Sequence, residues 1–324
     1  MTEKQIPNDI VEIQISNNDE VKEEGLETNN NKNISDHNNF FLNFIFNHSK
    51  SIFIFNILIL LISLIITTYF TLKEDDLDKL FWFNQITKYF SLIIIQICMS
   101  LLVHKYNVKV NYTRKIIHIS YFLLPQLLDT ILIRYNRSTL SEIWNIWIVL
   151  FLLFLVSEQI RNKVKIIRFM FKSVDRPEDQ PYTLIWFSTQ IISSLIILIP
   201  FSIYFNSIDK GGFTFIPILI NGLADGLAEP VGITFGKHKY KTKACLGDRE
   251  YTRSYEGSFC VYFVSLIIIL SYYFYMDLKQ YIFLAILLPP IITFTEAYAP
   301  HTWDSPFLFL VSCVMLTVSN FEMY

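Results

Sequence analysis

The chain has 324 residues, of which 52% are hydrophobic, 16% aromatic and only 17% charged, and its mean hydropathy is +0.37. A soluble domain usually carries about 25% charged residues, so the composition excludes an ordinary soluble protein. The formal net charge of −2 gives no basis for a nucleic-acid partner. The sequence predicts an all-α polytopic membrane protein whose surroundings are the lipid bilayer.

Residues 1–38 are acidic and rich in asparagine, as in "ETNNNKNISDHNN". They have too little apolar content to form a core, so we expect a disordered tail. The tail lacks the basic start and apolar stretch of a signal peptide and the character of a transit peptide. Insertion through the first transmembrane helix, with the tail in the cytosol, is the expectation.

A series of apolar runs follows the tail, and each is long enough to cross a bilayer. We count about nine, within a range of seven to nine, at residues 51–72, 83–103, 113–133, 143–160, 182–205, 213–235, 257–276, 280–298 and 304–321. Pro289 and Pro290 predict a kink or break in the eighth run. We expect N-terminal transmembrane helices over 39–110 and a transmembrane domain that carries the functional site over 111–324.

Basic residues gather in alternate loops of this map, which orients the helices. The rule that positive loops face the cytosol places the N-terminus in the cytosol and the C-terminus on the lumenal side. It also places four polar stretches on the cytosolic side, namely 112–118, 176–181, 235–258 and 296–304. Their convergence predicts a functional site at that face.

The sixth run carries carboxylates at membrane depth. Asn221, Asp225 and Glu229 are spaced i, i+4, i+8 and share one helix face. Two such carboxylates are costly unless they are paired or hold a cation, and Mg²⁺ is the cation that carboxylates and phosphates commonly share. We therefore predict Asp225 and Glu229 as metal ligands; the alternative is a structural role, with Lys or Arg of another span as partners. Pro230 predicts that the helix ends or kinks here and frees carbonyls.

Basic side chains suited to an anionic ligand follow this helix. Their predicted members are Lys237, His238, Lys239 and Arg253, together with Gly257 and Ser258 at the start of the seventh run and Arg114 and Lys115 at the start of the third. A helix N-terminus offers free N–H groups to anions. The alternatives are ordinary positive-inside residues and a plain N-cap at Ser258. His118, one turn beyond Arg114, is a candidate proton acceptor or a hydrogen-bonded bundle residue.

The stretch "DGLAEPVGITFGKHKY…RSYEGS" resembles the nucleotide-binding signature of the CTP-dependent polyprenol kinase family, which includes dolichol kinase, phytol kinase and a CTP-dependent diacylglycerol kinase. The matching positions are Asp225, Ala228, Gly232, Phe235, Gly236 and Lys237, then Arg253, Ser254, Glu256, Gly257 and Ser258. "RKIIHI" (114–119) and "EAYAPHTWDSP" (296–306) are similar to two further family segments. Glu229-Pro230 stands where the family has small or aliphatic residues.

The resemblance implies transfer of the CTP γ-phosphoryl group to the hydroxyl of a membrane lipid alcohol, giving a lipid monophosphate and CDP. Dolichol or another polyprenol is the first expectation, with diacylglycerol and phytol as alternatives. Phosphoryl transfer depends on positioning and charge neutralisation. The implied catalytic residues are Asp225, Glu256, Asp304 and His118, of which the last three are candidates to orient the hydroxyl.

Two other classes of protein remain open. A phosphatidate cytidylyltransferase-like enzyme would share CTP, Mg²⁺ and a similar acidic layout, but would release pyrophosphate instead of CDP. A transporter would use Asp225 and Glu229 as ion ligands in a broken helix. The chain shows no internal repeat that would pair two halves of a transporter.

Overall fold

In the computed structural model the described residues are 53–54, 56–73, 79–132, 139–180, 183–243, 250–300 and 303–321. The predicted disordered tail, 1–38, lies outside them, and the predicted domain division stays a prediction. From Ile62 on the chain forms one compact unit, Ile62–Tyr324. This unit contains all helices from α2 onward and both strands.

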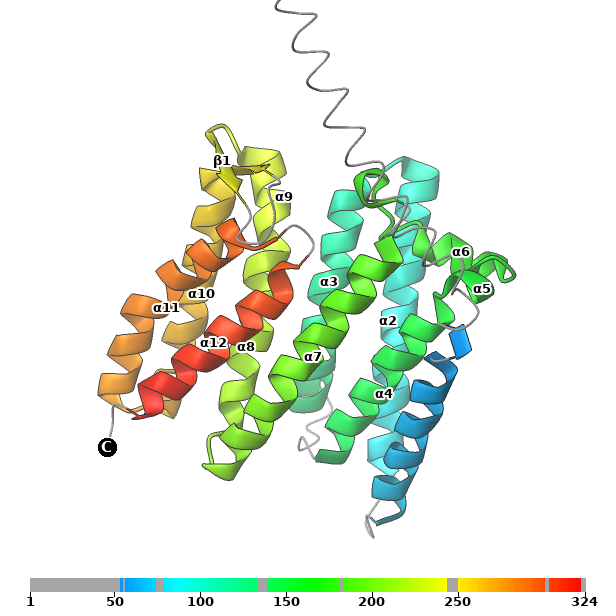
Figure 1. Ribbon diagram of the computed structural model, residues 1–324, viewed down its shortest axis with the longest axis horizontal. Coiled ribbons are helices and arrows are strands. Elements are labelled where there is room, and N and C mark those ends of the chain that lie inside the picture. Colours follow the sequence, from blue (N-terminus) through cyan, green and yellow to red (C-terminus); the bar gives the residue numbers. More distant parts are fainter. Residues whose placement is uncertain are drawn as a thin grey trace, which may run out of the picture. The chain divides into compact units, whose positions relative to one another are not determined.

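The unit is built of helices, and the all-α prediction is confirmed (Figure 1). In chain order the elements are α2 (Lys79–Tyr106), α3 (Val110–Leu127), the π-helix η1 (Leu128–Leu132), α4 (Thr139–Leu155), α5 (Glu158–Arg161), α6 (Lys165–Phe171), η2 (Pro177–Asp179), α7 (Thr183–Ser207), η3 (Gly211–Thr214), α8 (Phe215–Leu219), the π-helix η4 (Ile220–Asp225), α9 (Gly226–Phe235), β1 (Lys239–Lys243), β2 (Glu250–Ser254), α10 (Tyr255–Ser271), η5 (Tyr273–Tyr275), α11 (Leu278–Tyr298) and α12 (Asp304–Phe321).

Within the described residues, five helices are long and apolar enough to cross a membrane: Asn56–Lys73, Lys79–Tyr106, Thr183–Ser207, Gly211–Phe235 and Leu278–Tyr298. They coincide with five of the predicted spans. Three shorter apolar helices, Ile143–Leu155, Tyr255–Ser271 and Asp304–Asn320, coincide with three more. The remaining span, 113–133, corresponds to α3 and η1, which follow one another directly. The chain thus has the helices of a membrane protein.

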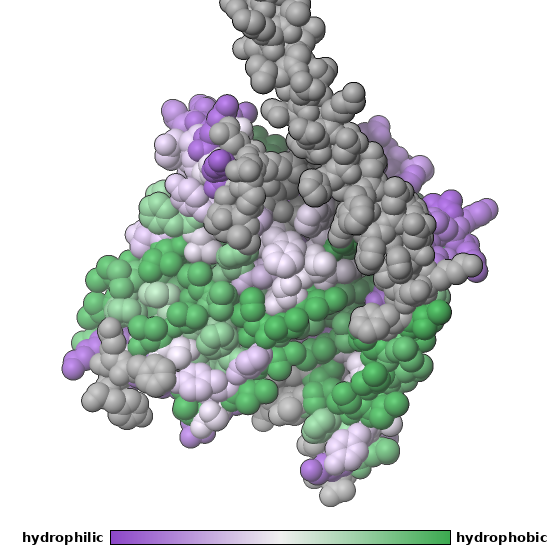
Figure 2. All heavy atoms as spheres, in the orientation of Figure 1, coloured by the Kyte–Doolittle hydropathy of each residue, from purple (hydrophilic) through white to green (hydrophobic). Residues whose placement is uncertain are grey.

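The surface shows the same division of polar and apolar residues. Figure 2 shows hydrophobic side chains over α7, α11 and α12, whereas hydrophilic ones gather over the β1–β2 hairpin and around α5 and α6. Large side chains such as Ile196, Phe259 and Ile286 are mostly exposed. Exposed apolar side chains of this size are unfavourable in water but favourable against lipid tails.

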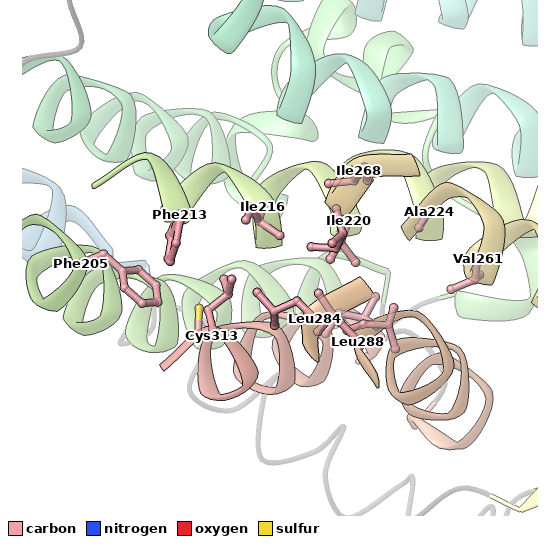
Figure 3. Close-up of a cluster of buried hydrophobic side chains, with 14 of the residues drawn as sticks. Phe205, Phe213, Ile216, Ile220, Ala224, Val261, Ile268, Leu284, Leu288 and Cys313 are labelled. Atoms are coloured by element: carbon pink, nitrogen blue, oxygen red, sulfur yellow. The ribbon is translucent and has the colours of Figure 1, made fainter. Parts of the chain in front are cut away.

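The aliphatic core surrounds the segment that carries Asp225. Figure 3 shows Ile216, Ile220 and Ala224 of this segment against side chains of its neighbours, namely Val261 and Ile268 of α10, Leu284 and Leu288 of α11, and Cys313 of α12. Two thirds of the apolar window in Gly211–Phe235 is buried, against 6% in Thr183–Ser207. The carboxylate-bearing segment is therefore held on several sides, while α7 lies at the periphery.

The breaks that the prolines allowed are absent. α11 runs through Pro289 and Pro290 without a break, and α9 runs through Pro230 to Phe235; a kink at these prolines stays a prediction. Leu288 and Ile292 are fully buried in the core, and this packing holds α11 across the missing N–H groups.

A two-stranded antiparallel hairpin, β1 and β2, occupies the region predicted as a loop after the sixth span. Its register pairs Tyr240 with Arg253 and Lys239 with Ser254. β2 leads directly into α10, so the pairing fixes where that helix begins. Helix α10 begins at Tyr255 and not at 257, and its N-cap is Ser254, whose side chain accepts a hydrogen bond from Gly257 N.

Gly222 and Gly226 allow α3 to pack closely on η4 and α9, as their small-xxx-small spacing predicts. A Cβ atom on Gly222 would lie 2.7 Å from Phe122 Cβ, and one on Gly226 would lie 2.4 Å from Ile119 Cγ1. These two positions therefore set the distance between α3 and the helix that carries the carboxylates.

We expect Gly226→Val to destabilise the protein by about 1–3 kcal/mol, because the added methyl groups must displace Ile119 or separate the helices. Thermal unfolding of the detergent-solubilised chain, followed by near-UV circular dichroism, measures the effect. Gly212→Ala is the matched control, since an added Cβ there has no atom within 4 Å. Equal melting temperatures for the two variants would contradict the close packing.

Candidate functional site

Asp225 closes the π-helical segment η4, and its side chain is only 3% exposed. Lys115 of α3, 4% exposed, reaches it with Nζ 2.8 Å from Asp225 Oδ1 and 3.0 Å from the Asp225 carbonyl oxygen. Pro230 has no N–H to donate to the carbonyl four residues before it, which is that of Gly226. Lys115 donates to the neighbouring carbonyl, that of Asp225, and the π-bulge, a frequent feature of functional sites, places this carbonyl and the Asp225 carboxylate within reach of the same Nζ.

His118 lies one turn farther along α3 and faces the same bulge. Its Nε2 is 2.9 Å from the Asn221 carbonyl oxygen and 3.3 Å from Asp225 Oδ2. Both neighbours are hydrogen-bond acceptors, so Nε2 carries a proton and donates it. The imidazole therefore orients Asp225, and its other nitrogen, Nδ1, is the one that could accept a proton.

Glu229 is held by three donors. Arg114 Nη2 lies 2.5 Å from Glu229 Oε2, while Asn111 Nδ2 and Arg176 Nη1 lie 2.8 Å and 3.2 Å from Oε1. Arg176 also binds Asp179, with Nε 2.7 Å from Oδ2. Through these contacts Glu229 links α9 to the start of α3 and to the polar stretch at 176–181.

Two more carboxylates come from the end of α11 and the start of α12. Glu296 pairs with Arg253 of β2. Asp304 Oδ1 accepts hydrogen bonds from Gln190 Nε2 of α7 and from Ser305 N, both at 2.9 Å.

Electrostatic proximity joins these pairs into one group. Asp304 lies within electrostatic range of Arg114, Lys115, His118 and Arg253. We name this group the charge cluster; it comprises Arg114, Lys115, His118, Arg176, Asp225, Glu229, Arg253, Glu296 and Asp304. All four polar stretches predicted at the cytosolic face contribute to it.

In the charge cluster and at Asn221, whose carbonyl contacts His118, lie buried polar atoms without a hydrogen-bond partner among the described residues. They are Arg114 Nε, Arg253 Nε and both amide atoms of Asn221, a residue that is 0% exposed. An unpaired buried polar atom costs about 1–3 kcal/mol, so such atoms mark either strain or a missing ligand. Two guanidinium donors without acceptors suit an anion.

The predicted basic residues after α9 lie apart from these contacts. Lys237, His238 and Lys239 are exposed on the approach to the hairpin, and no ion pair within the described residues joins them to Asp225 or Glu229. His238 instead pairs with Glu256, whose Oε1 lies 2.9 Å from its Nδ1.

The start of α10 is also more occupied than predicted. Gly257 N donates to Ser254 Oγ at 3.1 Å, so this N–H is not available to an anion in the present geometry. Ser258 Oγ lies 2.5 Å from Tyr240 OH. Burial raises the pKa of Tyr240 above its ordinary value, so the phenol stays protonated at neutral pH. The contact between Ser258 and Tyr240 links α10 to the hairpin. The N-cap of α10 is Ser254, not Ser258.

The carboxylates allow a test of the predicted magnesium ligands. Within the described residues no group of three or more His, Cys, Asp or Glu side chains could hold a metal ion. Arg114, Arg176 and Asn111 occupy the oxygens of Glu229, so Glu229 does not fit as a direct ligand beside Asp225. Mg²⁺ that arrives with a nucleotide needs only one or two protein carboxylates, because phosphates and water complete its shell. Asp225 and Asp304 are the carboxylates of the charge cluster that remain for this smaller requirement, and Asp225 would exchange its contact with Lys115 or His118 for the ion.

Asn111, Arg176, Gln190 and Glu296 are members or partners of the charge cluster that were not among the predicted site residues. Arg176 and Glu296 lie in polar stretches that the membrane map already placed at the cytosolic face. Asn111 and Gln190 carry no such signal, since a single amide in an apolar chain has many ordinary roles. Only the packing of α3 and α12 on their neighbours reveals these two.

Comparison of the chain with protein-family models, with curated proteins and with solved structures found no match. Its resemblance to the lipid-alcohol kinases therefore rests on the motifs quoted above.

We expect Lys115→Met to lower the free energy of unfolding by about 3–5 kcal/mol, because it leaves the buried Asp225 carboxylate without its cation. The double variant Lys115→Met/Asp225→Asn should recover much of that loss, since it removes the unpaired charge as well. Chemical denaturation in detergent, compared across the wild type and the variants, measures both steps. A double variant as unstable as the sum of its parts would contradict a direct pair.

Proposed function

We propose that the protein is a CTP-dependent kinase that phosphorylates the hydroxyl of a membrane lipid alcohol, with dolichol or another polyprenol as the preferred substrate. The observation that carries the proposal is the charge cluster, in which buried guanidinium donors without acceptors lie beside buried carboxylates. Such a mixture suits a ligand that brings both phosphates and a divalent cation.

The phosphates would bind on the basic side of the cluster. Arg114 and Arg253 each have an unpartnered Nε, and an Arg fork binds phosphate oxygens strongly. Lys115 acts electrostatically on the Asp304 carboxyl, as Arg114 and Arg253 do, and adds a third positive charge near it. Lys237, His238 and Lys239, exposed beside α9, are proposed to contact the outer part of the nucleotide, with Gly257 and Ser258 next to them.

Mg²⁺ is proposed to enter with CTP, bound by its phosphates and by Asp225, with Asp304 as a second carboxylate. When bound, it supplies neutralisation of the charge that gathers on the phosphate oxygens. Glu229 acts differently, because it holds Arg114 and Arg176 in place. This role also accounts for an acidic residue where the resembling family has a small or aliphatic one.

The reaction requires a hydroxyl from the bilayer and a base. The hydroxyl oxygen bonds to the γ-phosphorus, the bond between that phosphorus and the β–γ bridging oxygen breaks, CDP leaves, and the hydroxyl proton passes to a side chain. Asp304 and His118 inside the charge cluster and Glu256 beside it are the proposed candidates for that proton. The finer topology belongs to the same proposal: about nine spans in the endoplasmic reticulum, with the N-terminus cytosolic and the C-terminus lumenal.

The phosphatidate cytidylyltransferase-like reaction is the second candidate, because it would use the same CTP and Mg²⁺. A transporter is less favoured, since the acids are ion-paired and the cluster gathers at helix ends. Products separate the two enzymes, because a kinase forms CDP and a cytidylyltransferase forms pyrophosphate.

We expect membranes that contain the wild-type chain to transfer label from γ-³²P-CTP to one member of a panel of dolichol, short polyprenol, phytol and diacylglycerol. Asp225→Asn should lower this transfer by at least about 100-fold, because it removes a preorganised charge at the reacting phosphate. Chelation of Mg²⁺ with EDTA should abolish the transfer, and added Mg²⁺ should restore it. Organic-phase label is counted in each case.

Lys165→Gln, on the exposed side of α6, is the matched control and should retain wild-type transfer. Thermal unfolding of each variant shows whether a loss of transfer comes from a loss of fold. If no lipid is labelled and pyrophosphate is released when phosphatidate is supplied, the kinase proposal is wrong and the cytidylyltransferase-like activity takes its place. No label and no pyrophosphate would favour the transporter.

A further inference from the structure

An open groove of about 460 Å³ lies between α9 and α10, next to the hairpin. Its lining consists of Val231, Phe235, His238, Tyr255, Glu256, Phe259 and Cys260. α9 and α10 run side by side below β1 in Figure 1. β2, which carries Arg253 of the charge cluster, leads directly into the first turn of α10, so the groove adjoins the charge cluster at the start of that helix.

Most of this lining is apolar and turned outward. Phe235, Tyr255 and Phe259 are each more than 60% exposed. Tyr255 and Phe259 lie on α10, which is an apolar helix. Phe263, one turn below Phe259 and stacked on it with ring centroids 6.0 Å apart, is 50% exposed and continues the apolar surface. In a bilayer such a surface faces lipid chains, and a groove in it accepts a chain lengthwise.

The polar end of the groove is the pair of His238 and Glu256. Glu256 Oε1 is fully engaged, since it accepts from His238 Nδ1 at 2.9 Å and from the backbone N–H groups of Lys237 and His238 at 3.2 Å. Glu256 Oε2 is buried and has no hydrogen-bond partner among the described residues. A buried carboxylate oxygen of this kind needs a donor.

We infer that this groove holds the lipid acceptor, with the hydrocarbon chain along Phe235, Phe259 and Cys260 and the hydroxyl donating to Glu256 Oε2. The inference rests on the proposed kinase activity and deepens it. It names the groove that receives the substrate, and it selects Glu256 as the residue that holds the hydroxyl.

The negative charge of Glu256 at the polar end of the groove determines which class of lipid head group fits there. A hydroxyl provides the proton that Oε2 lacks, whereas the anionic phosphate of phosphatidate brings negative charge toward this carboxylate. The nearby cations Lys237, His238 and Lys239 are those proposed to contact the nucleotide. The groove therefore suits an uncharged long-chain alcohol and disfavours phosphatidate.

Cys260 gives a direct test that does not depend on turnover. The full chain in nanodiscs is treated with N-ethylmaleimide, and modification of each cysteine is quantified by peptide mass spectrometry. Dolichol at ten times its Kd should slow modification of Cys260 by about tenfold, because only the free fraction of the site reacts. Cys98 of α2, which is exposed, should react at the same rate throughout, and phosphatidate should leave Cys260 unprotected.

Glu256→Gln should weaken protection by dolichol about tenfold or more, the loss expected for a hydrogen bond to a charged group. Val231→Trp, which fills the groove, should raise the KM for the alcohol while the KM for CTP stays unchanged. Ile196→Leu, on the exposed side of α7 and outside the groove lining, is the control for both.

The outcomes separate the two proposals. Two results would refute the groove as the acceptor site while leaving the proposed kinase activity standing. They are transfer of label to dolichol without protection of Cys260, and equal protection of Cys260 by phosphatidate. Protection of Cys260 by dolichol with no transfer of label would support the groove and refute the kinase.

Discussion

The buried ion pair between Lys115 and Asp225 is the interaction on which the rest of the site depends. Both side chains are almost wholly enclosed, and charges in that position persist only when partners with good geometry hold them. Lys115 satisfies the carboxylate and a backbone carbonyl of the π-helical turn together. This double contact fixes α3 against η4, the two elements that carry Arg114, Lys115, His118 and Asp225 of the charge cluster.

Packing explains how such a costly arrangement is stable. Gly222 and Gly226 bring α3 close enough for Lys115 and His118 to reach the bulge, while Ile220 and Ala224 anchor the other side of the same segment in the aliphatic core. Glu229, one helical turn after Asp225, adds a second link through its ion pairs with Arg114 and Arg176. The guanidinium nitrogens that remain unpartnered are then held rigidly, as preorganised binding of a phosphate requires.

Much of this could be predicted from the sequence, for identifiable reasons. Apolar run length predicts the helices, and the alternation of basic loops predicts that 112–118, 176–181, 235–258 and 296–304 lie at one face. In the structure Arg114 and Arg176 share Glu229, which links the first two stretches, and Arg253 pairs with Glu296, which links the last two. Periodicity cannot give the pairing itself: nothing in the chain indicates that Glu229 binds Arg176 and not a metal. The hairpin was missed because its strands are short and charged, and the continuity of α11 through Pro289 comes from core packing that spacing does not reveal.

The most direct test of the central claim is binding of CTP to the charge cluster, measured without an acceptor lipid. The melting temperature of the purified chain in nanodiscs is followed while CTP and Mg²⁺ are added, for the wild type and for Arg253→Gln. Binding to the folded state stabilises it by about 2.7 kcal/mol at 100 times Kd, so a clear rise is expected for the wild type and a much smaller one for the variant. Equal rises in both proteins, or none in either, would contradict the account.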